Sequence, residues 1–253
     1  MNTLPQILRL KVDTSLMNTT RLLRCYWLPA VLLVIAYLIS PVIARPILIP
    51  VTRITNQEPS LLAQQQIANH SALYSLMQNT RTGKRASIVG VYAPNHFSFP
   101  IVQQPADDTV FVSPEPGVVT QFASASSYGT VGLLAHNTLA GAAFFDLKIG
   151  DKVLLLYGDR GARPYTIQSI RQFQALDPTN PYSDFIDLQA NNQRLNSKDL
   201  FKQIYSTGDR LVFQTCIDLD GQASWGRIFI TATPDEKKSG PYWPDFWQIY
   251  SLY

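Results

Sequence analysis

From Ala86 onward, short apolar runs alternate with turn-forming residues. The runs are ASIVGVYA, SFPIVQQ, TVFVS, GVVTQFA, TVGLLAH, KVLLLY, PYTIQSI, RLVFQTC and RIFITAT. They are rich in β-branched and aromatic residues, and Gly, Pro, Asn or Asp separates many of them, which is typical of an all-β barrel or sandwich. Further helical candidates are short and lie around FFDL and NSKDLFKQIY. The pattern therefore predicts a mostly β domain over residues 86–234.

A different pattern occupies the first part of the chain. The run CYWLPAVLLVIAYLISPVIA, residues 25–44, carries no charge. It is long enough to cross a bilayer core of ~30 Å as a helix. More cations precede the run than follow it, which predicts a cytoplasmic N-terminus and an extracellular remainder. We therefore expect a leader over 1–24 and a single-pass anchor over 25–44 in the cell membrane, with a cleaved signal peptide as the alternative.

Two segments flank the predicted β domain. Ser60 is a good N-cap, and the leucines of SLLAQQQIANHSALYSLMQ fall at roughly helical spacing, so residues 45–85 are predicted to form a stalk with a short helix. The C-terminal residues 235–253 are rich in aromatic side chains, and they are too short and polar for a second transmembrane helix. Their rings could pack on the barrel or face a membrane interface.

Composition excludes several classes of function. The net charge of the 253-residue chain is only +3, which argues against a nucleic-acid partner. The anchor would keep the sulfurs of Cys25 and Cys216 apart, so no disulfide is expected. Three histidines leave little material for a metal site, and no cofactor is expected. The sequence DLDG, with Asp218 and Asp220, is weakly similar to a calcium loop but lacks its other ligands.

Three side chains at predicted strand ends could carry chemistry. Cys216 ends one predicted strand and Arg227 opens the next, so a hairpin would bring them to one edge of the sheet. His136 ends another strand. A thiolate is a strong nucleophile, an imidazole transfers protons, and a guanidinium can stabilise an oxyanion. Each also has a structural alternative: a buried small thiol, an exposed histidine and a surface cation.

The arrangement of these residues resembles that of the sortase family. VFQTC followed by RIFITA is similar to the sortase signature, in which Thr-Cys ends one strand and Arg begins the next. TVGLLAHN followed by FFDLKIGDKVLL is similar to the stretch that carries the sortase histidine, and FPIV and PYTI also match sortase strands. The resemblance covers residues 86–233. It implies a sortase-like closed β-barrel with short helices, preceded by a transmembrane helix and a helical stalk.

The resemblance also implies roles for individual residues. Cys216 would be the nucleophile, His136 the proton donor and acceptor, and Arg227 the oxyanion stabiliser. Thr215 would help to shape the substrate groove. The chain departs from the family pattern at Val212-Phe213 and at Asn137, which affects the expected subclass and motif preference more than the reaction.

The implied activity is that of a cysteine transpeptidase. It would cleave the C-terminal sorting motif of exported proteins through a thioacyl intermediate. It would then transfer the acyl fragment to an amine of a cell-wall precursor or a pilin lysine. One alternative is an L,D-transpeptidase, although QTCID stands where that family has Ser-x-Gly-Cys. The other is a membrane-anchored, inactive sortase-like domain that only binds a partner.

Overall fold

The computed structural model describes residues 60–235. The predicted leader, the predicted anchor at 25–44 and residues 236–253 of the aromatic tail lie outside the described residues. Across residues 60–235, no helix combines the length and the apolar character that a membrane crossing needs.

The described residues form ten β-strands, one long helix and three short helical segments. The strands are β1 (Ile88–Ala93), β2 (Phe97–Gln103), β3 (Val119–Phe122), β4 (Val131–Leu134), β5 (Lys152–Tyr157), β6 (Ala162–Ala175), β7 (Phe185–Asp187), β8 (Arg194–Leu195), β9 (Leu211–Leu219) and β10 (Gln222–Pro234). The helices are α2 (Leu61–Asn79), α3 (Ala123–Ser126), the 3₁₀-helix η1 (Ala140–Asp146) and α4 (Ser197–Tyr205).

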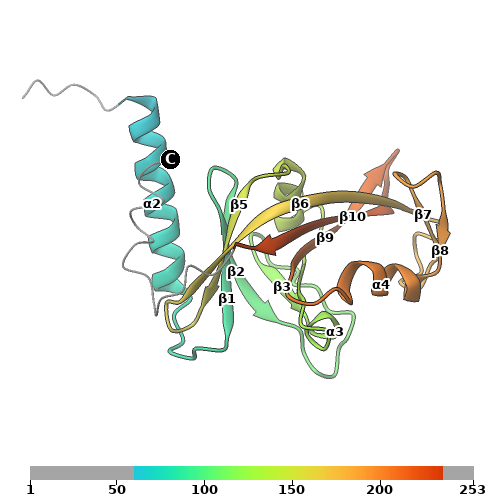
Figure 1. The fold of residues 1–253 in the computed structure, drawn as a ribbon, viewed down its shortest axis with the longest axis horizontal. Helices are drawn as coiled ribbons and strands as arrows, with labels where there is room; N and C mark the ends of the chain where they lie inside the picture. The colour runs from blue at the N-terminus through green and yellow to red at the C-terminus, as the bar shows by residue number, and fades with distance from the viewer. Residues whose placement is uncertain (1–59, 236–253) are drawn as a thin grey trace, which may run out of the picture. The chain divides into compact units, whose positions relative to one another are not determined.

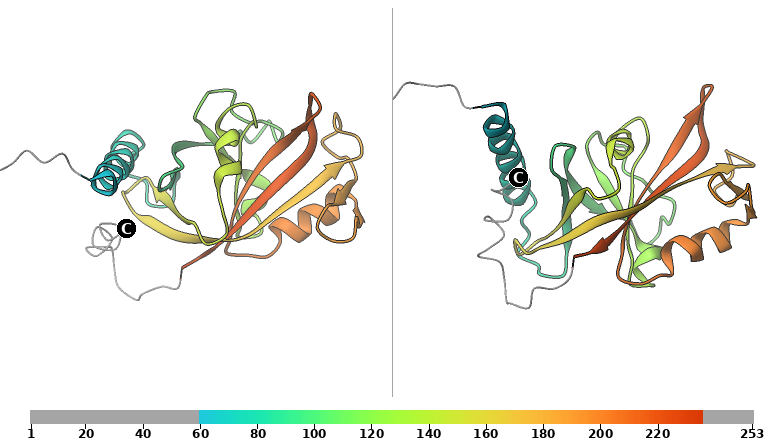
Figure 2. Two further views of the ribbon diagram at one scale, coloured as in Figure 1. Left: turned by 90° about the horizontal axis from the view of Figure 1, so that it is seen from above. Right: turned by 45° about the horizontal axis from the view of Figure 1, so that its top comes forward.

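The sheet closes into a barrel. Its strand order is β10-β9-β4-β3-β2-β1-β5-β6, and β10 also pairs with β6, which completes the ring. Strands β7 and β8 extend the sheet from β6, and Figure 1 shows them with α4 at the end away from α2. Figure 2 shows the long strands β6 and β10 running side by side. The expectation of a mostly β closed barrel is confirmed.

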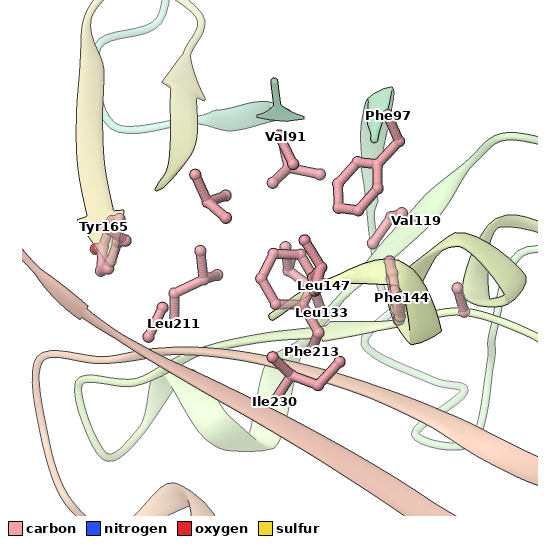
Figure 3. Close-up of a cluster of buried hydrophobic side chains, with 14 of the residues drawn as sticks. Val91, Phe97, Val119, Leu133, Phe144, Leu147, Tyr165, Leu211, Phe213 and Ile230 are labelled. Atoms are coloured by element: carbon pink, nitrogen blue, oxygen red, sulfur yellow. The ribbon is translucent and has the colours of Figure 1, made fainter. Parts of the chain in front are cut away.

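Alternating side chains fill the inside of the barrel. Leu211 and Phe213 of β9, together with Ile228 and Ile230 of β10, are almost completely buried in the main core. Phe144 enters this core from η1, with its ring centroid 5.1 Å from that of Phe213 (Figure 3). Because side chains alternate along a strand, the residues between these core positions lie on the outer face.

A second apolar cluster covers part of this outer face. It joins α4 to strands β6, β9 and β10, and it includes Phe173, Val212 and Phe229. Tyr205 of α4 is buried there, and burial raises the pKa of its phenol. Its hydroxyl donates a hydrogen bond of 2.5 Å to Oε1 of Gln214. The outer face of β9 is therefore rigidly supported up to two residues before Cys216.

Helix α2 packs directly on the barrel. Its Leu73 and Leu76 are buried in a third cluster with Tyr92 and Leu154. The Tyr92 hydroxyl also donates a hydrogen bond of 3.1 Å to the carbonyl of Asn69. The helix lies where the leucine spacing predicts one, and one side of it is buried against the barrel.

One predicted strand is absent from residues 60–235. The run TVFVS forms a loop, and Val110 within it is 66% exposed. The Gln104 amide donates hydrogen bonds to the carbonyls of Thr109 and Phe111, and the Thr120 hydroxyl accepts one from Ser113 N. Side chains thus satisfy the backbone groups that a neighbouring strand would otherwise pair, which β-propensity alone does not reveal.

Candidate active site

Cys216 and Arg227 are direct partners across the β9–β10 ladder. Paired residues of antiparallel strands project from the same face, so both side chains lie on the outer face of the barrel. Neither residue lies at a strand end, in contrast to the sequence prediction. The strands continue to a two-residue turn at Asp220 and Gly221, whose φ values are 52° and 80°. Asp-Gly suits a tight hairpin turn with two positive φ values.

The hairpin contains a bulge beside this pair. Between the rungs Leu219–Gln222 and Ile217–Gly226, β9 has one residue whereas β10 has three. The middle one, Ser224, places its hydroxyl oxygen 3.9 Å from the Cys216 sulfur. Bulges redirect side chains and are common next to active sites. Here the bulge brings a hydroxyl to the thiol.

The same bulge fixes the Arg227 guanidinium. Its Nη1 donates hydrogen bonds to the carbonyls of Ser224 at 3.0 Å and Gly226 at 2.8 Å. A guanidinium has five N–H donors, and Nη1 carries only two of them. Within residues 60–235, no hydrogen bond or ion pair is recorded for Nε or Nη2. The side chain is thus anchored at one nitrogen with donors left to bind another acceptor.

His136 follows β4, which runs parallel to β9. Leu134 is in register with Gln214, and the next amide, Ala135 N, donates a hydrogen bond of 3.3 Å to the Gln214 carbonyl. Continuing this register puts His136 level with Cys216, and the histidine is exposed. Strands β4, β9 and β10 are neighbours in the sheet. The fold therefore places Cys216 and Arg227 on paired strands, and His136 directly after the strand on the other side of β9.

The loop after His136 is tied to the hairpin. The Asn137 side chain donates a hydrogen bond of 3.0 Å to the carbonyl of Ala223, within the bulge. Asn137 is one of the positions where the chain departs from the sortase pattern. It links the histidine loop to the segment that carries Ser224.

Thr215 lies beside Cys216 in β9 and faces the inside of the barrel. It is only 2% exposed, and its hydroxyl donates a hydrogen bond of 2.8 Å to the carbonyl of Ala135. Because neighbouring residues of a strand face opposite sides, Thr215 turns away from the face that carries Cys216. Its hydroxyl holds the residue before His136 against β9. The expected part of Thr215 in shaping a substrate groove stays a prediction.

Gly141 is a positioning residue that sequence reasoning missed. Its amide donates a hydrogen bond of 3.0 Å to the His136 carbonyl. A Cβ at this position would lie 2.3 Å from the Thr215 hydroxyl oxygen and 2.7 Å from the His136 carbonyl oxygen. Only glycine allows η1 to approach β9 this closely. A glycine within a helical segment is disfavoured, and that was the available signal.

A row of paired residues continues from Cys216 across the sheet. Arg227 pairs with Phe173 on β6, and Phe173 pairs with Asp187 on β7. Asp187 is 1% exposed and forms an ion pair with Arg171, whose guanidinium carbon lies 5.0 Å from the Phe173 ring centroid. A buried, paired charge therefore lies two strands from Arg227. No sequence pattern pointed to this pair.

The described residues offer no evident metal centre. Across residues 60–235, no three His, Cys, Asp or Glu side chains are grouped so that they could hold a metal ion. Asp218 and Asp220 are exposed near the tip of the hairpin. The absence of a cofactor and the weak calcium alternative both stay predictions.

Comparison with known proteins gives one consistent result. Neither a family model nor a curated protein matches the sequence. The solved structures that the chain resembles are sortases. Sortase A of Listeria monocytogenes is 14% identical, with a TM-score of 0.38, over 59% of this chain and 88% of that one. Sortase C1 of Streptococcus agalactiae is 13% identical, with a TM-score of 0.39, over 73% of this chain and 91% of that one.

A third similar structure is another sortase C. Sortase C of Clostridium perfringens, described with the C-terminal cell wall sorting motif, is 15% identical with a TM-score of 0.36. The similarity covers 72% of this chain and 94% of that one. At these identities and scores, such likeness does not establish an activity.

Proposed function

We propose that the protein is a sortase-type cysteine transpeptidase. The in-register pairing of Cys216 with Arg227, beside the histidine that follows the neighbouring strand, is the observation that supports this function. In this proposal Cys216 is the nucleophile, His136 carries the proton and Arg227 supplies the cation. Each of these has a task in acyl transfer from a peptide to an amine.

In the proposed reaction, the Cys216 thiolate attacks the carbonyl carbon of a peptide bond in the sorting motif. A carbon–sulfur bond forms, and the carbonyl becomes a tetrahedral oxyanion. When the carbon–nitrogen bond breaks, protonated His136 gives its proton to the departing amine. The acyl fragment then remains on Cys216 as a thioester. An acceptor amine then attacks this thioester, and its proton passes to His136. The new carbon–nitrogen bond forms as the carbon–sulfur bond breaks, which restores the Cys216 thiolate and protonated His136.

Arg227 donates hydrogen bonds to the oxyanion in this scheme. Its Nη1 is held by two carbonyls of the bulge, so the guanidinium is oriented before substrate binds. Preorganised donors of this kind stabilise a transition state more than flexible ones do. Ser224, whose hydroxyl lies near the sulfur, supports the same thiol.

The proposed substrates are exported proteins that end in a sorting motif. The proposed acceptor is an amine of a cell-wall precursor or of a pilin lysine. Such a reaction requires an extracellular domain held at the cell membrane, and the uncharged run 25–44 would supply the anchor. No nucleic acid takes part.

A panel of variants tests this proposal. The full chain would be incubated with a sorting-peptide library and an amine, and cleavage and transfer would be measured separately. Cys216→Ala should abolish both reactions, and His136→Ala should come close to doing so. Arg227→Ala should lower the rate by roughly 10²–10³, as removal of an oxyanion donor does elsewhere. Arg227→Lys should rescue poorly, because a point charge does not reproduce the guanidinium fork.

Melting temperatures provide the control for the panel. All four variants should remain folded, because the side chains lie on the outer face rather than in the core. If Cys216→Ala still transfers a peptide to an amine, the catalytic assignment is wrong. If the wild-type chain binds the peptides but neither cleaves nor transfers them, the protein is a sortase-like binding domain instead.

A further inference from the structure

A large apolar groove lies between α2 and the barrel. Its volume is about 1040 Å³, and it is lined by α2, the β1–β2 turn and the start of β5. We call it the α2 groove and define it by Ile67, Tyr74, Tyr92, His96 and Lys152. It contains none of the residues around Cys216. Its occupant would therefore have a role separate from catalysis.

The helix presents unusually exposed apolar side chains to this groove. Ile67 is 62% exposed and Tyr74 is 53% exposed, although both line it. Leu73 and Leu76 on the same helix are buried against the barrel. Apolar side chains that gather along a concave surface mark a binding site more often than scattered ones do. The groove thus has the character of a docking surface for an apolar or aromatic segment.

The described chain ends beside this groove. A carboxylate oxygen of Asp235 lies 2.8 Å from Nζ of Lys152, a groove residue. The other oxygen accepts a hydrogen bond of 2.5 Å from the Thr166 hydroxyl, and Asp235 N donates one of 3.1 Å to the carbonyl of Pro164. These three contacts fix the point from which the remaining residues continue. That point is at the rim of the groove.

The composition of residues 236–253 suits this apolar groove. Residues 236–240, EKKSG, are polar and could serve as a linker, and the sequence PYWPDFWQIYSLY follows. It carries Trp243, Phe246 and Trp247 within five positions. A five-residue linker reaches about 16 Å when extended, and the whole segment reaches roughly 60 Å, whereas a 19-residue helix is about 28 Å long. The aromatic residues can therefore reach any part of the groove.

From these observations we propose that the C-terminal segment 236–253 docks in the α2 groove of its own chain. Tethering at Asp235 gives the segment an effective concentration in the millimolar range, which favours it over a free peptide. Aromatic rings would cover the exposed Ile67 and Tyr74, and Trp N–H groups could reach the polar end formed by His96 and Asp151, whose Nε2 and Oδ2 lie 3.1 Å apart. The docked segment would clamp α2 onto the barrel.

Site-specific photocrosslinking tests this proposal. The full chain, in detergent micelles and in phosphatidylcholine nanodiscs, would carry p-benzoylphenylalanine in place of Trp247. After irradiation, mass spectrometry should find this residue joined to peptides from α2 or from the β1–β2 turn. A chain with the probe in place of Tyr182, which is 74% exposed in the β6–β7 connection, should give no such product.

Isotope mixing separates docking within one chain from docking between chains. In an equal mixture of ¹⁴N and ¹⁵N chains, the crosslinked peptides should carry one isotope only. Tyr74→Ala should lower the yield severalfold, whereas Leu61→Ala should not, because Leu61 is exposed on the same helix but does not line the groove. Crosslinks to lipid, to a second chain or to other parts of the barrel would overturn the proposal, and so would their absence.

Discussion

At the scale of single residues, the candidate site depends on close contacts around β9. Cys216 and Arg227 share one rung of the ladder, and Ser224 reaches the sulfur from the bulge. On the opposite face, Thr215 and Gly141 hold the segment that ends at His136. The site therefore depends on these positioning residues as well as on the three residues that would carry its chemistry.

Gly141→Ala should displace His136 without changing Cys216. The new Cβ would collide with the Thr215 hydroxyl and the His136 carbonyl, so η1 or the histidine loop must shift. Overpacking of this kind typically costs about 1–3 kcal/mol of stability. We expect a lower melting temperature together with a loss of transfer activity. Ala142→Ser, at an exposed neighbouring position, should leave both unchanged, and an unaffected Gly141→Ala chain would refute this positioning role.

The sequence pointed to the three candidate residues but not to the residues that support them. The strand runs and the two motifs predicted Cys216, His136 and Arg227, because strand periodicity and residue type are local properties. The bulge at Ser224 and the inward-facing Thr215 depend on pairing between strands. Gly141 depends on how closely η1 approaches β9. Such features arise from tertiary packing, so one sequence does not specify them.

At the scale of elements, the extension β7–β8 and helix α4 support the outer face of β6, β9 and β10. The ion pair between Arg171 and Asp187 joins β6 to β7 beside Phe173. Asp187 is almost completely buried, so this pair differs from the exposed pairs on the surface. These elements fall within residues 177–205, where the sequence pattern predicted a short helix and no strand.

Asp187→Asn should weaken this region strongly. Arg171 would lose its buried partner, and breaking a buried pair typically costs about 3–5 kcal/mol. Arg194→Gln is the matched control, because its partnership with Asp184 is exposed, with Arg194 at 66%. Exposed pairs contribute about 0–1 kcal/mol. Urea unfolding should show the difference, and equal losses in the two variants would contradict a structural role for the buried pair.

At the scale of the whole molecule, the closed ring of eight strands leaves no open edge between β10 and β6. Two buried tyrosines lie on barrel strands, Tyr92 on β1 and Tyr165 on β6. Burial raises the pKa of both Tyr92 and Tyr165 to about 12 from the model-compound value of 10.0. Tyr92 also binds α2 through its hydroxyl. The folded state therefore favours the neutral form of these phenols, and ionising them weakens folding.

Alkaline pH should therefore destabilise the protein. Below pH 10 the phenols are neutral in both states, and their contribution to stability is fully present. As the pH rises toward 12, the unfolded chain loses these protons first, so the free energy of unfolding falls. Tyr92→Phe should make the fall less steep and should cost about 1 kcal/mol at neutral pH through the lost hydrogen bond. A flat pH dependence between 10 and 12 would contradict this coupling.

The most direct test of the proposed activity is to detect the acyl-enzyme. The chain would be mixed with a sorting-peptide library without an acceptor amine, quenched in acid, and examined by intact-mass and peptide mass spectrometry. We expect an added acyl mass on Cys216 that hydroxylamine removes, that accumulates less in His136→Ala and that is absent from Cys216→Ala. An unmodified Cys216 under conditions in which the peptide is cleaved, or an adduct on another residue, would contradict the proposed role of this thiol.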